Sequence, residues 1–165
     1  MKHADLLDPD SVAESAKGAE VVISAYSPPQ DRPEVLMDAT KALIAGLKKA
    51  QVARVIMVGG AGSLEVAPGL RLVDSPDFPA GWKGIARAHG DALQVLKESG
   101  LEWTSASPSA MIAPGERTGK FRIGKDQLLV DAKGESRISA EDFAIAVVDE
   151  LEQARYPRAR FTVGY

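Results

Sequence analysis

The chain has no cysteine, and its 165 residues include only two histidines. The absence of cysteine excludes disulfide bonds, cysteine-ligated zinc and thiol catalysis. The two histidines, His3 and His89, are too far apart in the sequence to form a spaced pair of metal ligands. We therefore expect no metal ion held by protein ligands.

Long apolar runs and basic clusters are also absent. No segment approaches the roughly 18 apolar residues of a membrane-spanning helix, and the N-terminal residues MKHADLLDPD lack the apolar core of a signal peptide. The 20 Lys and Arg residues against 23 Asp and Glu give a net charge of −3, without a basic run to follow a phosphate backbone. We expect a cytoplasmic protein that binds a small molecule and neither nucleic acid nor membrane.

What the sequence does contain is an alternation of strand-like and helix-like segments. The strand-like segments are continuous apolar runs, which is typical of strands buried on both faces of a parallel sheet. The length fits one domain, and neither an internal repeat nor a linker divides it. We predict one α/β domain over residues 1–165, a three-layer sandwich around a parallel sheet.

The predicted strands share this apolar character. They cover residues 20–26 (EVVISAY), 52–58 (VARVIMV), 101–107 (LEWTSAS) and 159–165 (ARFTVGY), and two shorter strands are expected within the glycine-rich residues 114–139.

The first and last predicted helices have clear N-caps. Asp8 caps a short helix that begins at Pro9 and ends at Gly18, and Ser139 caps the last helix. The core-facing residues of the last helix are Phe143, Val147 and Leu151.

The two central helices are longer. Asp31 and Glu34 form a capping-box-like pair at the start of the second predicted helix. The core face of this helix carries Leu36, Ala39, Leu43 and Leu47. The third covers residues 82–99 and ends at Gly100, with Ile85, His89, Leu93 and Leu96 on one face. The proline-rich connection over residues 65–80 is expected to be a functional lid or rim.

A cluster of glycines follows the second predicted strand, in the stretch ARVIMVGGAGSLEVAPG (residues 53–69). A dinucleotide-binding fingerprint needs G-x-G-x-x-G at the start of a helix. Gly60 and Gly62 match its first two glycines, but Glu65 occupies the third position and Pro68 breaks the chain where the helix must start. We interpret the stretch as a tight strand exit whose bare backbone approaches a ligand.

The order of motifs resembles a known family. The segments ADLLD, VVISAY, VIMVGGAG, ESGLEWTSASPSAMIAPG and RISAEDFAIAVVDELE resemble the atypical short-chain dehydrogenase/reductase superfamily, and within it the NAD(P)H-binding, NmrA-like branch that includes NADH-flavin reductases. The resemblance covers essentially the whole chain. It implies a Rossmann-like fold, NAD(P)H as the cofactor, and FMN or FAD as a substrate.

The same resemblance implies that the N-terminal glycine-rich βαβ segment of the family is missing from this sequence. The chain would then be the C-terminal two-thirds of the family fold, either as a fragment or as a shortened relative. On this view the strand over residues 20–26 has an open apolar edge. We expect that edge to pair with a second copy in a homodimer.

The resemblance also implies a set of cofactor-binding residues. Asp5 and Leu6 would lie beside the adenine, Ser24, Ala25 and Tyr26 at a strand end, Gly59, Gly60 and Ala61 beside the nicotinamide, and Pro108, Ser109, Ala110 and Met111 against its amide group. Each set also has a purely structural interpretation: Asp5 as a turn residue, and the others as loops that follow strands. Both interpretations stay open at this point.

The proton-donating residues of ordinary short-chain reductases are not in their places. Their serine position falls on Gly59–Ala61, and their tyrosine and lysine positions read Ile85 and His89. His89 is the remaining candidate for proton transfer, although a histidine on an apolar helix face is more often a packed residue. Ser63 lies close enough in sequence to replace the serine, with a turn residue as the alternative.

Two other motifs resemble catalytic or phosphate-binding signatures but lack residues that those signatures require. The residues GERTGKF (115–121) resemble a P-loop but have one residue too few between the glycines, and Phe121 stands where Ser or Thr must hold magnesium. A Ser63–His89–Asp triad lacks the G-x-S-x-G elbow of a nucleophilic serine.

The functional hypothesis is an NAD(P)H-dependent oxidoreductase that passes hydride from nicotinamide to a flavin or quinone-like acceptor. Such a reaction depends mainly on holding two planar ring systems together, so it tolerates the loss of the proton donors. The alternatives are a non-catalytic redox-sensing or protein-binding module and a fragment without ligand.

Overall fold

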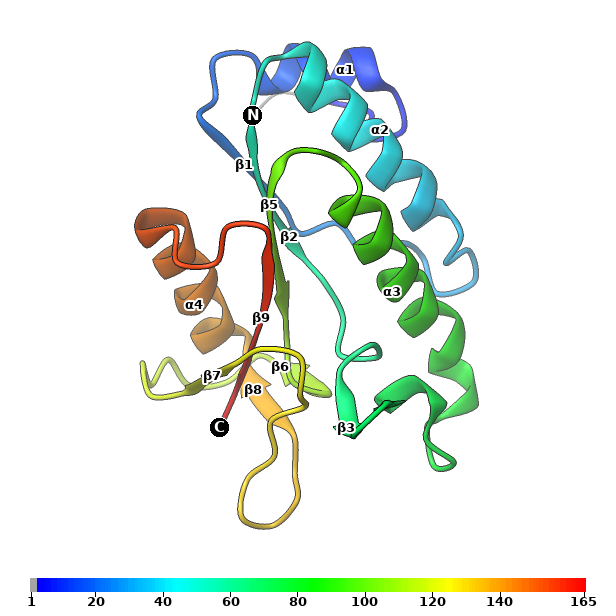
Figure 1. Ribbon diagram of the computed structural model, residues 1–165, viewed down its shortest axis with the longest axis vertical. Helices are drawn as coiled ribbons and strands as arrows, with labels where there is room; N and C mark the ends of the chain where they lie inside the picture. Colours follow the sequence, from blue (N-terminus) through cyan, green and yellow to red (C-terminus); the bar gives the residue numbers. More distant parts are fainter. Residues whose placement is uncertain (1–2) are drawn as a thin grey trace.

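The computed structural model describes residues 3–165 as a central five-stranded sheet between two layers of helices (Figure 1). The strand order is β1-β2-β5-β9-β7, and only β7 runs antiparallel to its neighbour. The bounds are β1 Val21–Ser24, β2 Arg54–Val58, β5 Glu102–Ser107, β9 Ala159–Gly164 and β7 Arg122–Gly124. The predicted α/β class with a mostly parallel sheet is confirmed.

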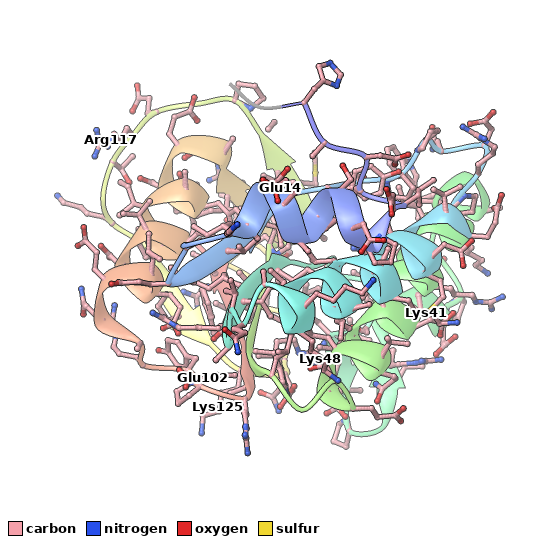
Figure 2. The ribbon with its side chains drawn as sticks, turned by 90° about the horizontal axis from the view of Figure 1, so that it is seen from above. Glu14, Lys41, Lys48, Glu102, Arg117 and Lys125 are labelled. Atoms are coloured by element: carbon pink, nitrogen blue, oxygen red, sulfur yellow. The ribbon has the colours of Figure 1, made fainter. Side chains whose placement is uncertain are left out.

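The helices divide unequally between the two faces of the sheet. Helices α1 (Pro9–Ala16), α2 (Val35–Lys49) and α3 (Lys83–Lys97) lie on one side, and α4 (Ala140–Gln153) lies on the other (Figure 1). Successive side chains of β2 point to opposite faces of the sheet. Val55 and Met57 pack with α2 and α3, whereas Ile56 packs with α4. The charged side chains of Glu14, Lys41 and Lys48 extend from the outer surfaces of α1 and α2 (Figure 2).

The helix ends test the predicted caps. Asp8 Oδ1 accepts from the N–H of Asp10 at 3.0 Å, and Ser139 Oγ accepts from the N–H of Asp142 at 3.1 Å, so both N-caps are confirmed. The capping box of Asp31 and Glu34 is wrong, because α2 begins at Val35 and Glu34 makes no side-chain cap bond. Backbone turns over residues 29–36 supply the first bonds of that helix instead.

The predicted strands are confirmed with some shortening. The first covers Val21–Ser24 and not residues 20–26, because pairing with β2 ends at Ser24, before two prolines. The predicted core faces of α2 and α4 are also confirmed. Leu36, Ala39, Leu43, Leu47, Phe143 and Val147 are buried, and Leu151 is half-buried.

Two long connections contain small sheets of their own. Residues 65–82 form the hairpin β3 (Glu65–Ala67) and β4 (Leu70–Arg71) and two short 3-10 turns; β6 (Met111–Ala113) pairs in parallel with β8 (Arg137–Ser139). The two connections touch, because the Glu65 N–H donates to the Asp126 carbonyl at 2.8 Å and the Leu128 N–H donates to the Glu65 carbonyl at 2.9 Å. The 65–80 segment is therefore anchored to the other loop and not structureless. Its role as a lid stays a prediction.

No helix within residues 3–165 is long and apolar enough to cross a membrane.

Strand β1 is an edge strand of the described sheet, and its Ile23 is 39% exposed. An apolar edge with unpaired backbone groups tends to pair with another strand, so we expect the protein to form dimers as its concentration rises. Light scattering over a concentration series measures this. The Ile23→Lys substitution should shift the protein toward monomer, and an unmodified protein that stays monomeric at high concentration would contradict the expectation.

Candidate functional site

Three predicted segments meet because β1, β2 and β5 are adjacent and parallel. Ser24 pairs with Met57 in the sheet register, and Val58 pairs with Ala106, so the three strands end at nearly the same level. The carboxyl ends of parallel strands form the usual ligand-binding edge of an open α/β sheet. The segments brought to this edge are Ser24–Tyr26, Gly59–Ala61 and Pro108–Met111 (Figure 1).

The glycines after β2 are explained largely by packing. A Cβ on Gly60 would lie 3.1 Å from the Cβ of His89, and a Cβ on Gly62 would lie 2.7 Å from the Cβ of Ala86. Both glycines therefore let helix α3 approach the loop. A ligand lying against their bare backbone stays a prediction. A Cβ on Gly59 would lie 3.0 Å from Ser105 Oγ and 3.5 Å from Ser107 Oγ. Hydroxyl groups from β5 thus border the position of the missing serine.

Three buried polar atoms at this end of the sheet have no hydrogen-bond partner within residues 3–165: His89 Nδ1, Ser107 Oγ and Thr162 Oγ1. Ser107 and Thr162 are direct neighbours across the β5–β9 pair. A buried polar atom without a partner costs roughly 1–3 kcal/mol, and such atoms gather where function requires them. The sequence pattern did not single out Thr162, because its strand lies more than 50 residues beyond Ser107 and only the sheet order brings them together.

Burial lowers the pKa of His89 below its ordinary value of 6.5. The imidazole is therefore neutral at neutral pH. His89 Nδ1 is buried without a hydrogen-bond partner among residues 3–165. Burying an N–H donor without an acceptor costs more free energy than burying a nitrogen lone pair without a donor, so we infer that the proton of the neutral ring is on Nε2. His89 can then donate a hydrogen bond without carrying charge.

This pKa shift predicts a loss of stability in mild acid. The unfolded chain binds a proton at His89 near pH 6.5, whereas the folded chain does so only at lower pH, so the free energy of unfolding should fall as the pH drops below about 6.5. Denaturant unfolding between about pH 7 and pH 5 measures the effect. The His89→Gln variant should lack this part of the pH dependence. An NMR titration that places the His89 pKa at or above 6.5 would contradict the assignment.

The segment after β5 is held more tightly than the sequence suggested. Ser109 Oγ donates to the Val163 carbonyl at 2.8 Å, and the N–H groups of Ala110 and Met111 donate to Oγ and the carbonyl of Ser136, at 3.1 and 3.0 Å. These donors are not available for a nicotinamide amide. Pro108 is buried, whereas the Ala110 and Met111 side chains are exposed, so this segment offers surface and not hydrogen-bond donors.

Asp5 and Leu6 lie in the turn before α1. Asp5 Oδ1 accepts from the Leu7 N–H at 2.9 Å, and Leu6 packs against the core beneath α2 and α3. The geometry favours the turn interpretation of Asp5. Contact of either residue with an adenine stays a prediction.

Ser63 has a structural partner. Its Oγ accepts from Arg160 Nη1 at 2.8 Å, and the same guanidinium pairs with Asp126 at 2.6 Å. This network ties the loop after β2 to β9 and to the loop after β7. A hydroxyl that accepts from a guanidinium is poorly placed as a nucleophile, which agrees with the rejection of a Ser63–His89–Asp triad.

Comparison with known proteins gives a consistent set of relatives. A family model described as NAD(P)H-binding matches residues 2–154. The uncharacterized protein YwnB of Bacillus subtilis is 42% identical over 155 aligned residues, which cover 92% of this chain and 73% of that protein. The crystal structure of a "putative exported protein" from Burkholderia pseudomallei is 53% identical with a TM-score of 0.93, covering 99% of this chain and 80% of that one. That of a "putative NADH-flavin reductase" from Streptococcus pneumoniae is 33% identical with a TM-score of 0.85, covering 97% and 77%.

Proposed function

The chain belongs to the NAD(P)H-binding family, in the NmrA-like branch of the short-chain dehydrogenase/reductase superfamily, and from this premise we propose that it is a reductase that passes hydride from NAD(P)H to a flavin or quinone-like acceptor. The observation that carries the proposal is the convergence of three strand ends beside unpartnered buried polar atoms. Small residues there, such as Ala25 and Ala61, leave room for a planar ring to lie against the backbone.

The reaction needs little acid–base help from the protein. When bound, the cofactor supplies a hydride from C4 of the nicotinamide; the acceptor takes this hydride and one proton from water, and gains two electrons. The residues then have to bind, orient and exclude water. The neutral His89 and the Ser107 hydroxyl would supply hydrogen bonds at the strand ends. Ile85 in the place of the usual tyrosine argues against ordinary ketone reduction.

The named relatives support this proposal to different degrees. The Streptococcus pneumoniae protein is described as a "putative NADH-flavin reductase", which fits a flavin acceptor. The Burkholderia pseudomallei protein is described as a "putative exported protein", so a cytoplasmic location stays a proposal that rests on the sequence alone.

The test is oxidation of NADH and NADPH by the purified protein in the presence of FMN, FAD or menadione, followed by the absorbance of the reduced nicotinamide. We expect oxidation that depends on both protein and acceptor. Cofactor binding without oxidation by any acceptor would instead favour a redox-sensing module, the interpretation that the missing proton donors support. A protein that neither binds nor oxidises the cofactor would contradict both.

A further inference from the structure

The segment that follows β7 crosses β9 on the face of the sheet away from α4, and we call residues 125–129 the strap (Figure 1). The side chains of β9 identify this face. Val163 belongs to the core with α4, so Arg160, Thr162 and Gly164 point to the other side. The strap contacts Arg160 at one end and the backbone of Gly164 at the other, which places it above Thr162.

Leu129 is the side chain that seats the strap on the sheet. A Cβ on Gly164 would lie 3.0 Å from the Cβ of Leu129, and a Cβ on Gly124 would lie 3.1 Å from its Cδ2. Gly124 is the direct partner of Thr162 across the β7–β9 pair. The two glycines therefore leave a socket for Leu129 beside Thr162, because a side chain at either position would fill it.

Polar contacts from two neighbouring segments fasten the strap. The Asp126 carboxylate accepts from Arg160 Nε at 3.0 Å and from Nη2 at 2.6 Å. The third nitrogen of the same guanidinium, Nη1, donates to Ser63 Oγ at 2.8 Å. Glu65 adds two backbone hydrogen bonds, one donated to Asp126 and one accepted from Leu128. The strap is thus held at particular points between its two ends.

Two buried hydroxyl groups lie at the floor under the strap. Thr162 and Ser107 are 0% and 1% exposed, and neither hydroxyl has a hydrogen-bond partner within residues 3–165. The two residues are direct neighbours across the β5–β9 pair, so their side chains share a face. A buried polar group without a partner loses the hydrogen bonds that it makes to water. Closing the strap over these hydroxyls therefore costs free energy that opening returns.

The strap itself contributes little buried surface. Lys125, Asp126 and Gln127 are exposed, and Leu128 and Leu129 are only half-buried. Strand β9 beneath it, in contrast, supplies fully buried residues to the core with α4. A segment with few buried apolar contacts opens at a lower free energy than the whole domain unfolds. The strap can therefore open while the sheet stays folded.

We propose that the strap is a gate, which opens apart from the rest of the fold and gives small molecules access to the Ser107 and Thr162 hydroxyls. The gated site adjoins the predicted nicotinamide segment, because a Cβ on Gly59 would lie 3.5 Å from Ser107 Oγ. Arg160 also joins the gate to the loop after β2 through Ser63. The inference rests on this geometry and holds whether or not the chain is a reductase.

The absence of native cysteine makes thiol labelling a direct test. Thr162→Cys places a thiol beneath the strap, and Val163→Cys places one on the α4 face of the same strand. The rate of reaction with DTNB, divided by the rate for the same variant in denaturant, reports how often each thiol becomes exposed. We expect Thr162→Cys to react at least about tenfold faster than Val163→Cys. Urea below the unfolding transition should accelerate Val163→Cys more, because the effect of urea grows with the surface that is exposed.

Loosening the strap should speed the labelling of Thr162→Cys further. Arg160→Gln removes the clamp and Leu129→Ala empties the socket, and we expect each to raise the rate at least about fivefold, with a smaller effect on Val163→Cys. The matched controls are Arg158→Gln and Val130→Ala, which make the same chemical changes at exposed positions near the clamp and the socket. They should leave the rate for Thr162→Cys nearly unchanged.

Ser107→Cys is a second reporter of the same gate, for use if Thr162→Cys lowers the melting temperature of the whole protein. It should show the same pattern of rates. The inference is overturned if both thiols react as slowly as Val163→Cys and share its urea dependence, because they are then exposed only by global unfolding. It is also overturned if Arg160→Gln and Leu129→Ala leave the rate for Thr162→Cys unchanged, since access then does not pass the strap.

Discussion

The Asp142→Asn substitution is expected to lower the free energy of unfolding by about 3 kcal/mol, or the melting temperature by about 6–12 °C. The buried carboxylate accepts from the Thr118 hydroxyl, the Gly119 N–H and the Tyr165 hydroxyl. An amide presents two N–H donors to this set of donors, so at least one buried bond is lost and one repulsive contact appears. Thermal unfolding followed by circular dichroism measures the change.

The matched control for this experiment is Glu152→Gln, which removes the same charge from an exposed position of helix α4. It should change the melting temperature by little, since exposed charges contribute roughly 0–1 kcal/mol. Equal melting temperatures for the Asp142 variant and the unmodified protein would contradict this role of the Asp142 hydrogen bonds.

Acid should remove the same contribution. Burial alone would raise the pKa of Asp142, but the hydrogen bonds from Thr118, Gly119 and Tyr165 outweigh it and hold the pKa below its ordinary value. The stabilisation is therefore present above about pH 4 and is lost as the pH falls through the native pKa.

Large side chains at the meeting point of the strands should block the cofactor. We expect Ala25→Trp and Ala110→Trp each to weaken NAD(P)H binding by about tenfold or more, because each places an indole where the nicotinamide half of the cofactor is proposed to lie. Both alanines are exposed, so the fold should tolerate the change. Nicotinamide fluorescence gives the dissociation constants.

Ala144→Trp provides the comparison, since Ala144 is exposed on α4, on the opposite side of the sheet from α1–α3. It should bind NAD(P)H like the unmodified protein. If all three tryptophan variants bind equally well, the cofactor lies elsewhere.

Much of the fold follows from local patterns in the sequence. Continuous apolar runs such as VARVIMV predict strands buried on both faces, and Asp8 and Ser139 are N-caps with the expected bonds. The capping box at Asp31 failed, because a Pro-rich run of turns precedes α2 and its backbone groups bond to one another. A capping motif in the sequence therefore predicts where a helix begins only if the backbone N–H groups at that position are not already hydrogen-bonded within preceding turns.

The sequence predicts at which edge of the sheet the candidate site lies, but not which side chains contact one another there. Strand ends of a parallel sheet always lie on one side, so the meeting of the segments at Ser24, Gly59 and Pro108 follows from the sequence. The use of Ser109 to bind the Val163 carbonyl does not, because it depends on β9 lying next to β5. The same is true of the hydrogen bond from Tyr165 to Asp142, since these two residues meet only when α4 and the end of β9 pack together.

We expect this chain to bind a nicotinamide cofactor at the carboxyl ends of β1, β2 and β5. Titration of the purified 165-residue protein with NADH and NADPH, followed by nicotinamide fluorescence, tests it most directly. We expect saturable binding with a dissociation constant in the micromolar range, and weaker binding in the Ala25 and Ala110 variants. An absence of binding by either cofactor at millimolar concentration would contradict it.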